Sequence, residues 1–84
     1  MKYFVYILKS KKDNRLYIGQ TSNLEDRIKR HNEGRVISTK GRRPLELLYY
    51  EEFADRGSAT RRENYFKSLK NPQYLLSLVG GPIV

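Results

Sequence analysis

The 84-residue chain contains no cysteine, and that absence excludes three kinds of chemistry. A protein without thiols forms no disulfide bond, binds no metal through thiolates and has no cysteine nucleophile. Histidine is scarce as well: His31 is the only one, so a metal site built from several histidines is excluded. A small domain that needs no disulfide bonds suits the reducing cytosol, and we expect a cytoplasmic protein.

Long hydrophobic runs are also missing. No apolar segment approaches the roughly 20 residues that a membrane-spanning helix needs. The first eight residues are apolar enough to suggest a secretion signal, but tyrosines interrupt them and no small-residue cleavage site follows. We expect no membrane association and interpret this segment as a β-strand.

Acidic residues are few: 9 Asp and Glu stand against 17 Lys and Arg, which gives a formal net charge of +8. So basic a balance on so small a chain indicates a polyanionic partner, either nucleic acid or an anionic membrane surface. A basic surface that serves only solubility is the plain alternative.

The chain is long enough for one modest hydrophobic core. Hydrophobic residues make up 38% of it and aromatic residues 12%, which is typical of globular rather than disordered proteins. We expect a single domain over 1–84, with its core at about 3–70 and a short helix and tail over 72–84. We expect a monomer or a weak dimer.

The first part of the chain predicts a β-hairpin followed by a helix. Residues 3–9 and 15–19 have strand character, and the polar turn between them predicts antiparallel pairing. Gly19 would end the second strand and allow a close backbone approach. The helix would begin at Ser22, as a capping box with Glu25, or at Asn23, and would stop near Gly34. Leu24, Ile28 and His31 would share one face of it.

The second part predicts one more strand and two helices. A basic, polar connection over 35–43 leads to a strand over 45–53. Ser58 is a candidate N-cap for a helix from Ala59 to about Lys70, with Ala59, Phe66 and Leu69 on its apolar face. Asn71-Pro72 would break that helix and start a short one through Leu78, before a frayed tail at 80–82. The order β-β-α-β-α-α predicts an α+β fold, a small three-stranded antiparallel sheet flanked by helices.

Two tyrosines, Tyr6 and Tyr17, lie on the neighbouring strands of the hairpin. Tyrosine is a common strand residue, so packing alone could explain either of them. A phenol can act as a general base only if its pKa falls below the ordinary value of about 10, and nearby cations would lower it.

Arg27 and His31 are four residues apart, which makes their side chains neighbours on the first helix. An arginine at the edge of the sheet could hold phosphate oxygens in a bidentate way, or it could simply lie along a solvated helix face. Glu63 falls between Ala59 and Phe66 on an otherwise apolar stripe. A carboxylate there needs a partner, either an arginine in a structural ion pair or a hard divalent cation.

Together these residues resemble the GIY-YIG nuclease superfamily. Phe4-Val5-Tyr6, then ten residues, then Tyr17-Ile18-Gly19 is similar to its paired motif, although Phe-Val replaces Gly-Ile. Arg27, His31 and Glu63 follow at positions like those of its helix motif and its metal-binding glutamate. For the asparagine that many family nucleases carry beyond the glutamate, Asn71 is the nearest candidate. The chain is most similar to the short, stand-alone, single-domain members.

This resemblance implies a metal-dependent endonuclease that hydrolyses phosphodiester bonds in DNA, structure-selective or weakly sequence-selective, with a role such as DNA repair or recombination. Tyr17 would deprotonate or position water, and Tyr6 and His31 would hydrogen-bond the nucleophile or the phosphate. Arg27 would neutralise phosphate charge, and Glu63 would hold one Mg²⁺ or Mn²⁺ ion. RNA remains a second substrate class, and a protein partner could supply specificity.

Four basic residues between the first helix and the third strand, Arg35, Lys40, Arg42 and Arg43, are candidates for contacts with the nucleic-acid backbone. A solvated loop is the alternative. Two other functions compete with the endonuclease: a nucleic-acid-binding module that has the fold but weak catalysis, and a protein-interaction domain whose charge serves solubility.

Overall fold

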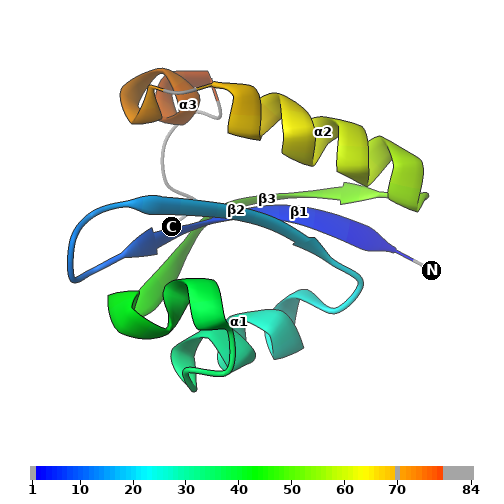
Figure 1. The fold of residues 1–84 in the computed structure, drawn as a ribbon. Coiled ribbons are helices and arrows are strands. Elements are labelled where there is room, and N and C mark those ends of the chain that lie inside the picture. Colours follow the sequence, from blue (N-terminus) through cyan, green and yellow to red (C-terminus); the bar gives the residue numbers. More distant parts are fainter. Residues whose placement is uncertain (1, 70, 79–84) are drawn as a thin grey trace.

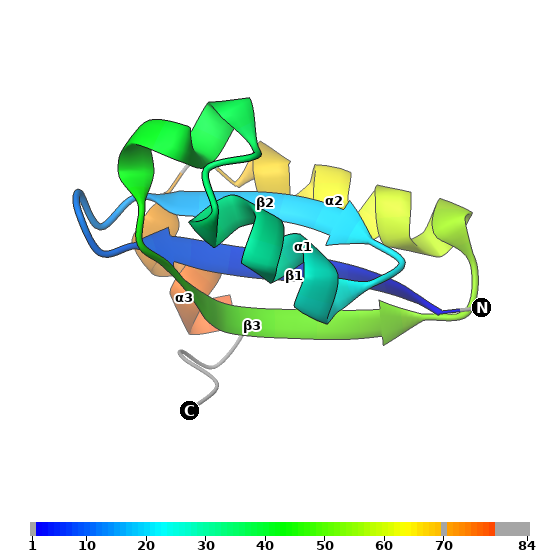
Figure 2. The same cartoon turned by 90° about the horizontal axis from the view of Figure 1, so that it is seen from below.

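The computed structural model describes residues 2–69 and 71–78 (Figure 1). A three-stranded antiparallel sheet has the order β2-β1-β3, so the first strand is central. Helices cover both of its faces, which confirms the predicted α+β fold (Figures 1 and 2). The elements in chain order are β1 (Tyr3–Ser10), β2 (Leu16–Thr21), α1 (Leu24–Asn32), the 3₁₀ helix η1 (Ile37–Arg42), β3 (Leu45–Phe53), α2 (Arg56–Ser68) and α3 (Pro72–Leu78).

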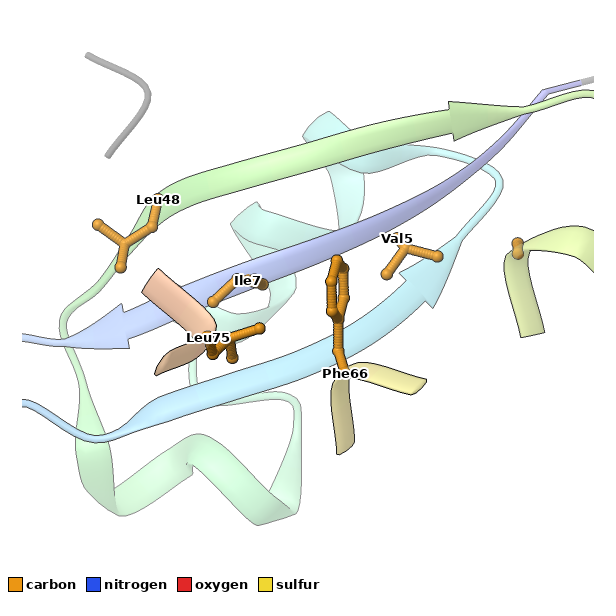
Figure 3. Close-up of a cluster of buried hydrophobic side chains, with 6 residues drawn as sticks. Val5, Ile7, Leu48, Phe66 and Leu75 are labelled. Atoms are coloured by element: carbon orange, nitrogen blue, oxygen red, sulfur yellow. The ribbon is translucent and has the colours of Figure 1, made fainter. Parts of the chain in front are cut away.

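The central strand β1 is buried on both faces, because each face packs against a different set of helices. Val5 and Ile7 face α2 and α3 and pack with Phe66 and Leu75 (Figure 3). Tyr6 and Leu8, which alternate with them, belong to the cluster beneath α1. The sheet therefore lies between two apolar layers, and a polar group on the α1 side sits inside one of them.

Two boundaries in the hairpin and α1 are settled by hydrogen bonds. β2 continues through Thr21, so Gly19 lies inside the strand, and the prediction that it ends the strand is wrong. Asn23, not Ser22, is the N-cap of α1, because its side chain accepts a 3.1 Å hydrogen bond from the backbone of Asp26. Gly34 has φ of +77°, the left-handed conformation expected just beyond a helix end.

The start of α2 corrects another prediction. Asp55 caps it, with a 2.8 Å hydrogen bond from the backbone N–H of Ser58, so Ser58 is not the N-cap. A carboxylate is the stronger acceptor at that position, and the Ser58 hydroxyl donates to it as well. The helix ends at Ser68 because Leu69 is extended, earlier than the predicted end at about Lys70.

The predictions for the basic connection and for the end of the chain had different outcomes. The predicted basic connection contains η1, which the sequence pattern did not indicate. The helix from Pro72 through Leu78 is confirmed, whereas the predicted tail at 80–82 lies outside the described residues. Across the ranges that the structure describes, no helix combines the length and the hydrophobicity that a membrane crossing requires.

Candidate active site

Four of the predicted site residues meet on the α1 side of the sheet. Tyr6 on β1 is paired in register with Gly19 on β2, and Tyr17 lies two residues before that glycine on the same face. Arg27 and His31 descend from α1 onto this face. The Tyr6 hydroxyl lies 3.0 Å from Nε2 of His31 and 3.4 Å from Nε of Arg27. The Tyr17 and His31 rings meet edge to face, with centroids 4.9 Å apart.

A chain of hydrogen bonds orders these groups. The Thr39 hydroxyl donates to the carbonyl of Val36, so it accepts from Nδ1–H of His31 at 2.7 Å. Nε2 of the neutral ring is then an acceptor, and the Tyr6 hydroxyl donates to it. The Tyr6 oxygen in turn accepts from Arg27. The Arg27 guanidinium is thus bound to a neutral phenol, and the neutral imidazole of His31 orients that phenol.

The pKa values agree with this assignment of donors and acceptors, in which Tyr6 and His31 are neutral. Burial, followed by the charge of Arg27, lowers the pKa of His31 to about 4. Burial raises the pKa of Tyr6, and the hydrogen bond from Arg27 only partly opposes it. Arg27 therefore lowers the pKa of Tyr6, as expected of a nearby cation, but burial outweighs it and Tyr6 remains a phenol at neutral pH.

Exposure separates the four residues into two pairs. Tyr6 and His31 are 0% exposed, whereas Tyr17 and Arg27 are half-buried. The hydrogen bond that Arg27 donates to Tyr6, and to a smaller degree the proximity of Tyr17, raises the pKa of Arg27. A phosphate could reach Tyr17 and Arg27 directly. In this structure Tyr6 and His31 contact each other, and their direct contact with substrate stays a prediction.

Glu63, on α2, contacts the edge strand β2 from the face of the sheet opposite to α1. Gln20 on β2 donates to its Oε1 at 2.8 Å and to the Thr60 hydroxyl at 2.9 Å. Lys67, one turn along α2, contacts Oε2 at 2.9 Å. The carboxylate is thus partnered by a lysine and an amide rather than by an arginine, which was one of the two partners that the sequence left open. Sequence reasoning missed Gln20 and Thr39, since neither belongs to a helical or strand pattern shared with the residue that it contacts.

Comparison with known proteins places this site in a family. The GIY-YIG catalytic domain matches residues 2–75. The chain belongs to the GIY-YIG family. UPF0213 protein SH2523 of Staphylococcus haemolyticus is 47% identical over 75 residues, which cover 88% of this chain and 90% of that protein. UPF0213 protein CPE1444 of Clostridium perfringens is 49% identical over 73 residues, 86% of this chain and 77% of that protein.

A solved structure supports the same assignment. The solution NMR structure of UPF0213 protein BH0048 from Bacillus halodurans matches with a TM-score of 0.64 and 38% identity, over 98% of this chain and 89% of that one. GIY-YIG domains are in general nuclease domains, so the family agrees with the coarse function that the residues suggest.

GIY-YIG nucleases typically use divalent metals, so the side chains near Glu63 matter as possible ligands for such an ion. No group of three or more acidic or histidine side chains that could hold an ion occurs in the described part of the chain. Mg²⁺ often takes one carboxylate and keeps its waters, which suits a single glutamate. Lys67 is 54% exposed and can move away from Oε2, so the residues fit one hydrated ion at Glu63.

Asn71, the candidate for the family's asparagine, and some of the four candidate nucleic-acid-binding residues have structural partners of their own. The Asn71 side chain caps α3 by accepting from the backbone of Gln73 at 2.9 Å. Arg42 points inward, to Asp13 at 3.6 Å and to the carbonyl of Leu16. Arg35, Lys40 and Arg43 are all exposed; Arg35 pairs with Glu33, and Arg43 donates to the carbonyl of Lys40 at 2.9 Å. Contact of these residues with phosphate stays a prediction.

Gly19 gives the GIY-YIG site its closest packing, and a side chain there should disturb it. A Cβ at this position would lie 2.5 Å from the Tyr6 hydroxyl and 3.1 Å from the Tyr17 ring. We expect Gly19→Ala to displace Tyr6 from His31 and to lower the free energy of unfolding by about 1–3 kcal/mol. Chemical denaturation measures this, with Gly41→Ala as the control because a Cβ there meets nothing within 4 Å. Equal stability of the two variants would contradict the packing argument.

His31 should make stability depend on pH. Its folded pKa of about 4 lies below the ordinary 6.5, so the unfolded chain binds the extra proton between these values. The stabilisation is complete above pH 6.5 and is lost as the pH falls toward 4. We expect the free energy of unfolding to drop by about 2 kcal/mol from pH 7 to 5, above the range where carboxylates titrate. Denaturant titrations of His31→Gln should show a flatter profile over that interval; an equally steep one would assign the dependence to other groups.

Proposed function

We propose that this protein is a divalent-metal-dependent endonuclease that hydrolyses phosphodiester bonds in DNA, with structural or weak sequence selectivity. The observation that carries the proposal is the gathering of Arg27 and Tyr17 around Tyr6 and His31 on one face of the sheet, with Glu63 held by Gln20 on the other side of β2. A buried chain of hydrogen bonds through Tyr6, His31 and Thr39 supports Arg27 on its buried side. A purely structural cluster would not need a half-exposed arginine beside a half-exposed phenol.

The proposed chemistry is in-line displacement at phosphorus. Tyr17 orients the attacking water or, as the phenolate, accepts its proton. The water oxygen bonds to phosphorus, the bond to the leaving oxygen breaks, and the leaving oxygen takes up a proton from solvent. Arg27 neutralises charge on the non-bridging oxygens. Because its guanidinium is already oriented by Tyr6, it needs little rearrangement to reach the transition state. Glu63 would hold Mg²⁺ or Mn²⁺, which when bound stabilises negative charge on the leaving oxygen. Acting on DNA, such a protein would work in the cytoplasm, and repair or recombination would suit its selectivity.

The test is a cleavage assay with Mg²⁺ and with Mn²⁺ over duplex, flap, branched and single-stranded DNA, with RNA versions alongside. We expect metal-dependent cleavage that chelator abolishes and Arg27→Ala lowers strongly. Tight binding without cleavage on every substrate, with either metal, would favour the second candidate, a nucleic-acid-binding module of the same fold. The net charge of +8 supports that alternative as well as the first.

Binding to DNA should be largely electrostatic, because the exposed cations Lys40 and Arg43 of the η1 segment lie next to the exposed Lys12 of the hairpin turn. η1 is fastened to the hairpin by hydrogen bonds from Ser10 to the Arg42 carbonyl at 2.6 Å and from Lys12 to the Gly41 carbonyl at 3.2 Å. Affinity should therefore fall steeply with salt. We expect the double variant Lys40→Ala/Arg43→Ala to reduce the slope of log affinity against log salt by about 2.

The matched control for this slope is Lys2→Ala/Arg56→Ala. It removes the same charge at the opposite end of the sheet, where Tyr3 pairs with Phe53. Fluorescence anisotropy at several salt concentrations gives both slopes. An equal slope for the two double variants would remove η1 from the binding surface.

A further inference from the structure

A groove of about 460 Å³ runs along the α2–α3 side of β2, beside the candidate active site. Figure 1 shows α3 and the end of α2 over the hairpin half of the sheet, where this groove lies. Its floor is apolar and one wall is basic. The residues that matter are Leu16, Ile18, Leu69 and Leu75 in the floor and Arg15 and Arg42 in the wall.

The two arginines are held differently. Arg42 is fixed by the Leu16 carbonyl at 3.4 Å and by Asp13 at 3.6 Å, yet its buried Nε has no hydrogen-bond partner among the described residues. Arg15 is exposed, and within the ranges described here its side chain makes no ion pair. The groove thus offers one ordered guanidinium and one that is available to a ligand.

The groove and the candidate site share one strand. Ile18 directly precedes Gly19, and Leu16 is three residues from it, about 10 Å along an extended chain. A nucleic-acid strand that places one phosphate at Arg27 and crosses the β2 edge would bring a neighbouring nucleotide to this groove.

We propose that the groove binds one unpaired nucleotide of the substrate, with its base on the apolar floor and its phosphate at Arg15 and Arg42. The leucine and isoleucine side chains offer no hydrogen bonds to base edges, so the contact would accept any base. Inside a duplex the faces of a base are covered by its neighbours, and only an unpaired base can lie on such a floor. The inference rests on the proposed function and narrows its substrate to DNA with a single-stranded segment beside the cut.

The experiment compares two labelled DNAs by anisotropy, in chelator and with the full chain: a continuous duplex and the same duplex with a four-thymidine flap. We expect about tenfold tighter binding of the flap, because the apolar floor removes one face of the base from water. Arg15→Ala should reduce this preference to about twofold to threefold. Arg56→Ala removes the same charge at the far end of α2 and should leave the preference intact.

A second measurement locates the contact without a variant. In methyl NMR spectra of the labelled chain, a thymidine pentanucleotide should shift the signals of Ile18 and Leu69. The proposal that the groove binds a nucleotide would be overturned by unshifted methyl signals, by equal affinity for the two DNAs, or by the same flap preference in both arginine variants. Cleavage without flap preference would contradict only the proposed role of the groove. Flap preference without cleavage of any substrate would contradict the proposed nuclease function and leave the role of the groove standing.

Discussion

Tyr17→Phe should lower the cleavage rate by about 10²–10⁴-fold, the usual contribution of a general acid–base group. The substitution removes only the hydroxyl. The ring keeps its edge-to-face contact with His31, 4.9 Å between centroids, and its place beside Tyr6. We therefore expect the melting temperature to change little while single-turnover cleavage nearly disappears.

Tyr50→Phe is the matched control for this loss. Tyr50 is a strand tyrosine on β3, the opposite edge of the sheet, and it is 42% exposed. It should cleave at the wild-type rate. If Tyr17→Phe also cleaved at that rate, Tyr17 would be a packing residue and the proposed general base would have to be another group.

Glu63→Gln should abolish metal-dependent cleavage, a loss of at least about 10²-fold, because it removes the negative charge that would hold the ion and keeps the shape of the side chain. DNA affinity in chelator should be unchanged or higher, since one negative charge near the phosphate is gone. The melting temperature should stay equal or rise. Glu63 is 14% exposed, but its charged partner Lys67 is 54% exposed, so the substitution strands no buried cation.

Glu51→Gln provides the contrast on the other edge of the sheet. Glu51 holds Arg62 through two hydrogen bonds of 2.9 and 3.1 Å and also accepts from the Tyr49 hydroxyl. Burial opposes its ionised form, but the hydrogen bonds from Arg62 and Tyr49 prevail and lower its pKa. We expect its loss to cost about 1–3 kcal/mol, with a clear fall in melting temperature and cleavage retained.

Melting with and without Mg²⁺ then decides the role of Glu63. An ion that binds only the folded chain raises the melting temperature. The wild type should show that rise and Glu63→Gln should not. A large fall in stability for Glu63→Gln in both conditions would instead make the carboxylate a structural group and would leave the binding module as the better account.

What the sequence by itself determined about this protein is the part that depends on local geometry. A two-residue period carries Tyr6 to the face opposite Val5, and a four-residue spacing sets Arg27 beside His31, whatever packs around them. Hairpin pairing across a short polar turn brings Tyr6 opposite Gly19 for the same reason. These rules were enough to predict the α+β fold, and together with the resemblance to the GIY-YIG superfamily they predicted four of the residues that meet in the site.

Only the tertiary structure decided which of these groups are buried and which partners they have. Thr39 reaches His31 because η1 folds back beneath α1, and Gln20 reaches Glu63 across 43 residues because α2 packs on β2. Such contacts depend on how whole elements dock, and no period in the chain encodes them. Burial then sets the chemistry: it raises the pKa of Tyr6 and lowers that of His31, so the buried pair is neutral and Tyr17 and Arg27 are left at the surface.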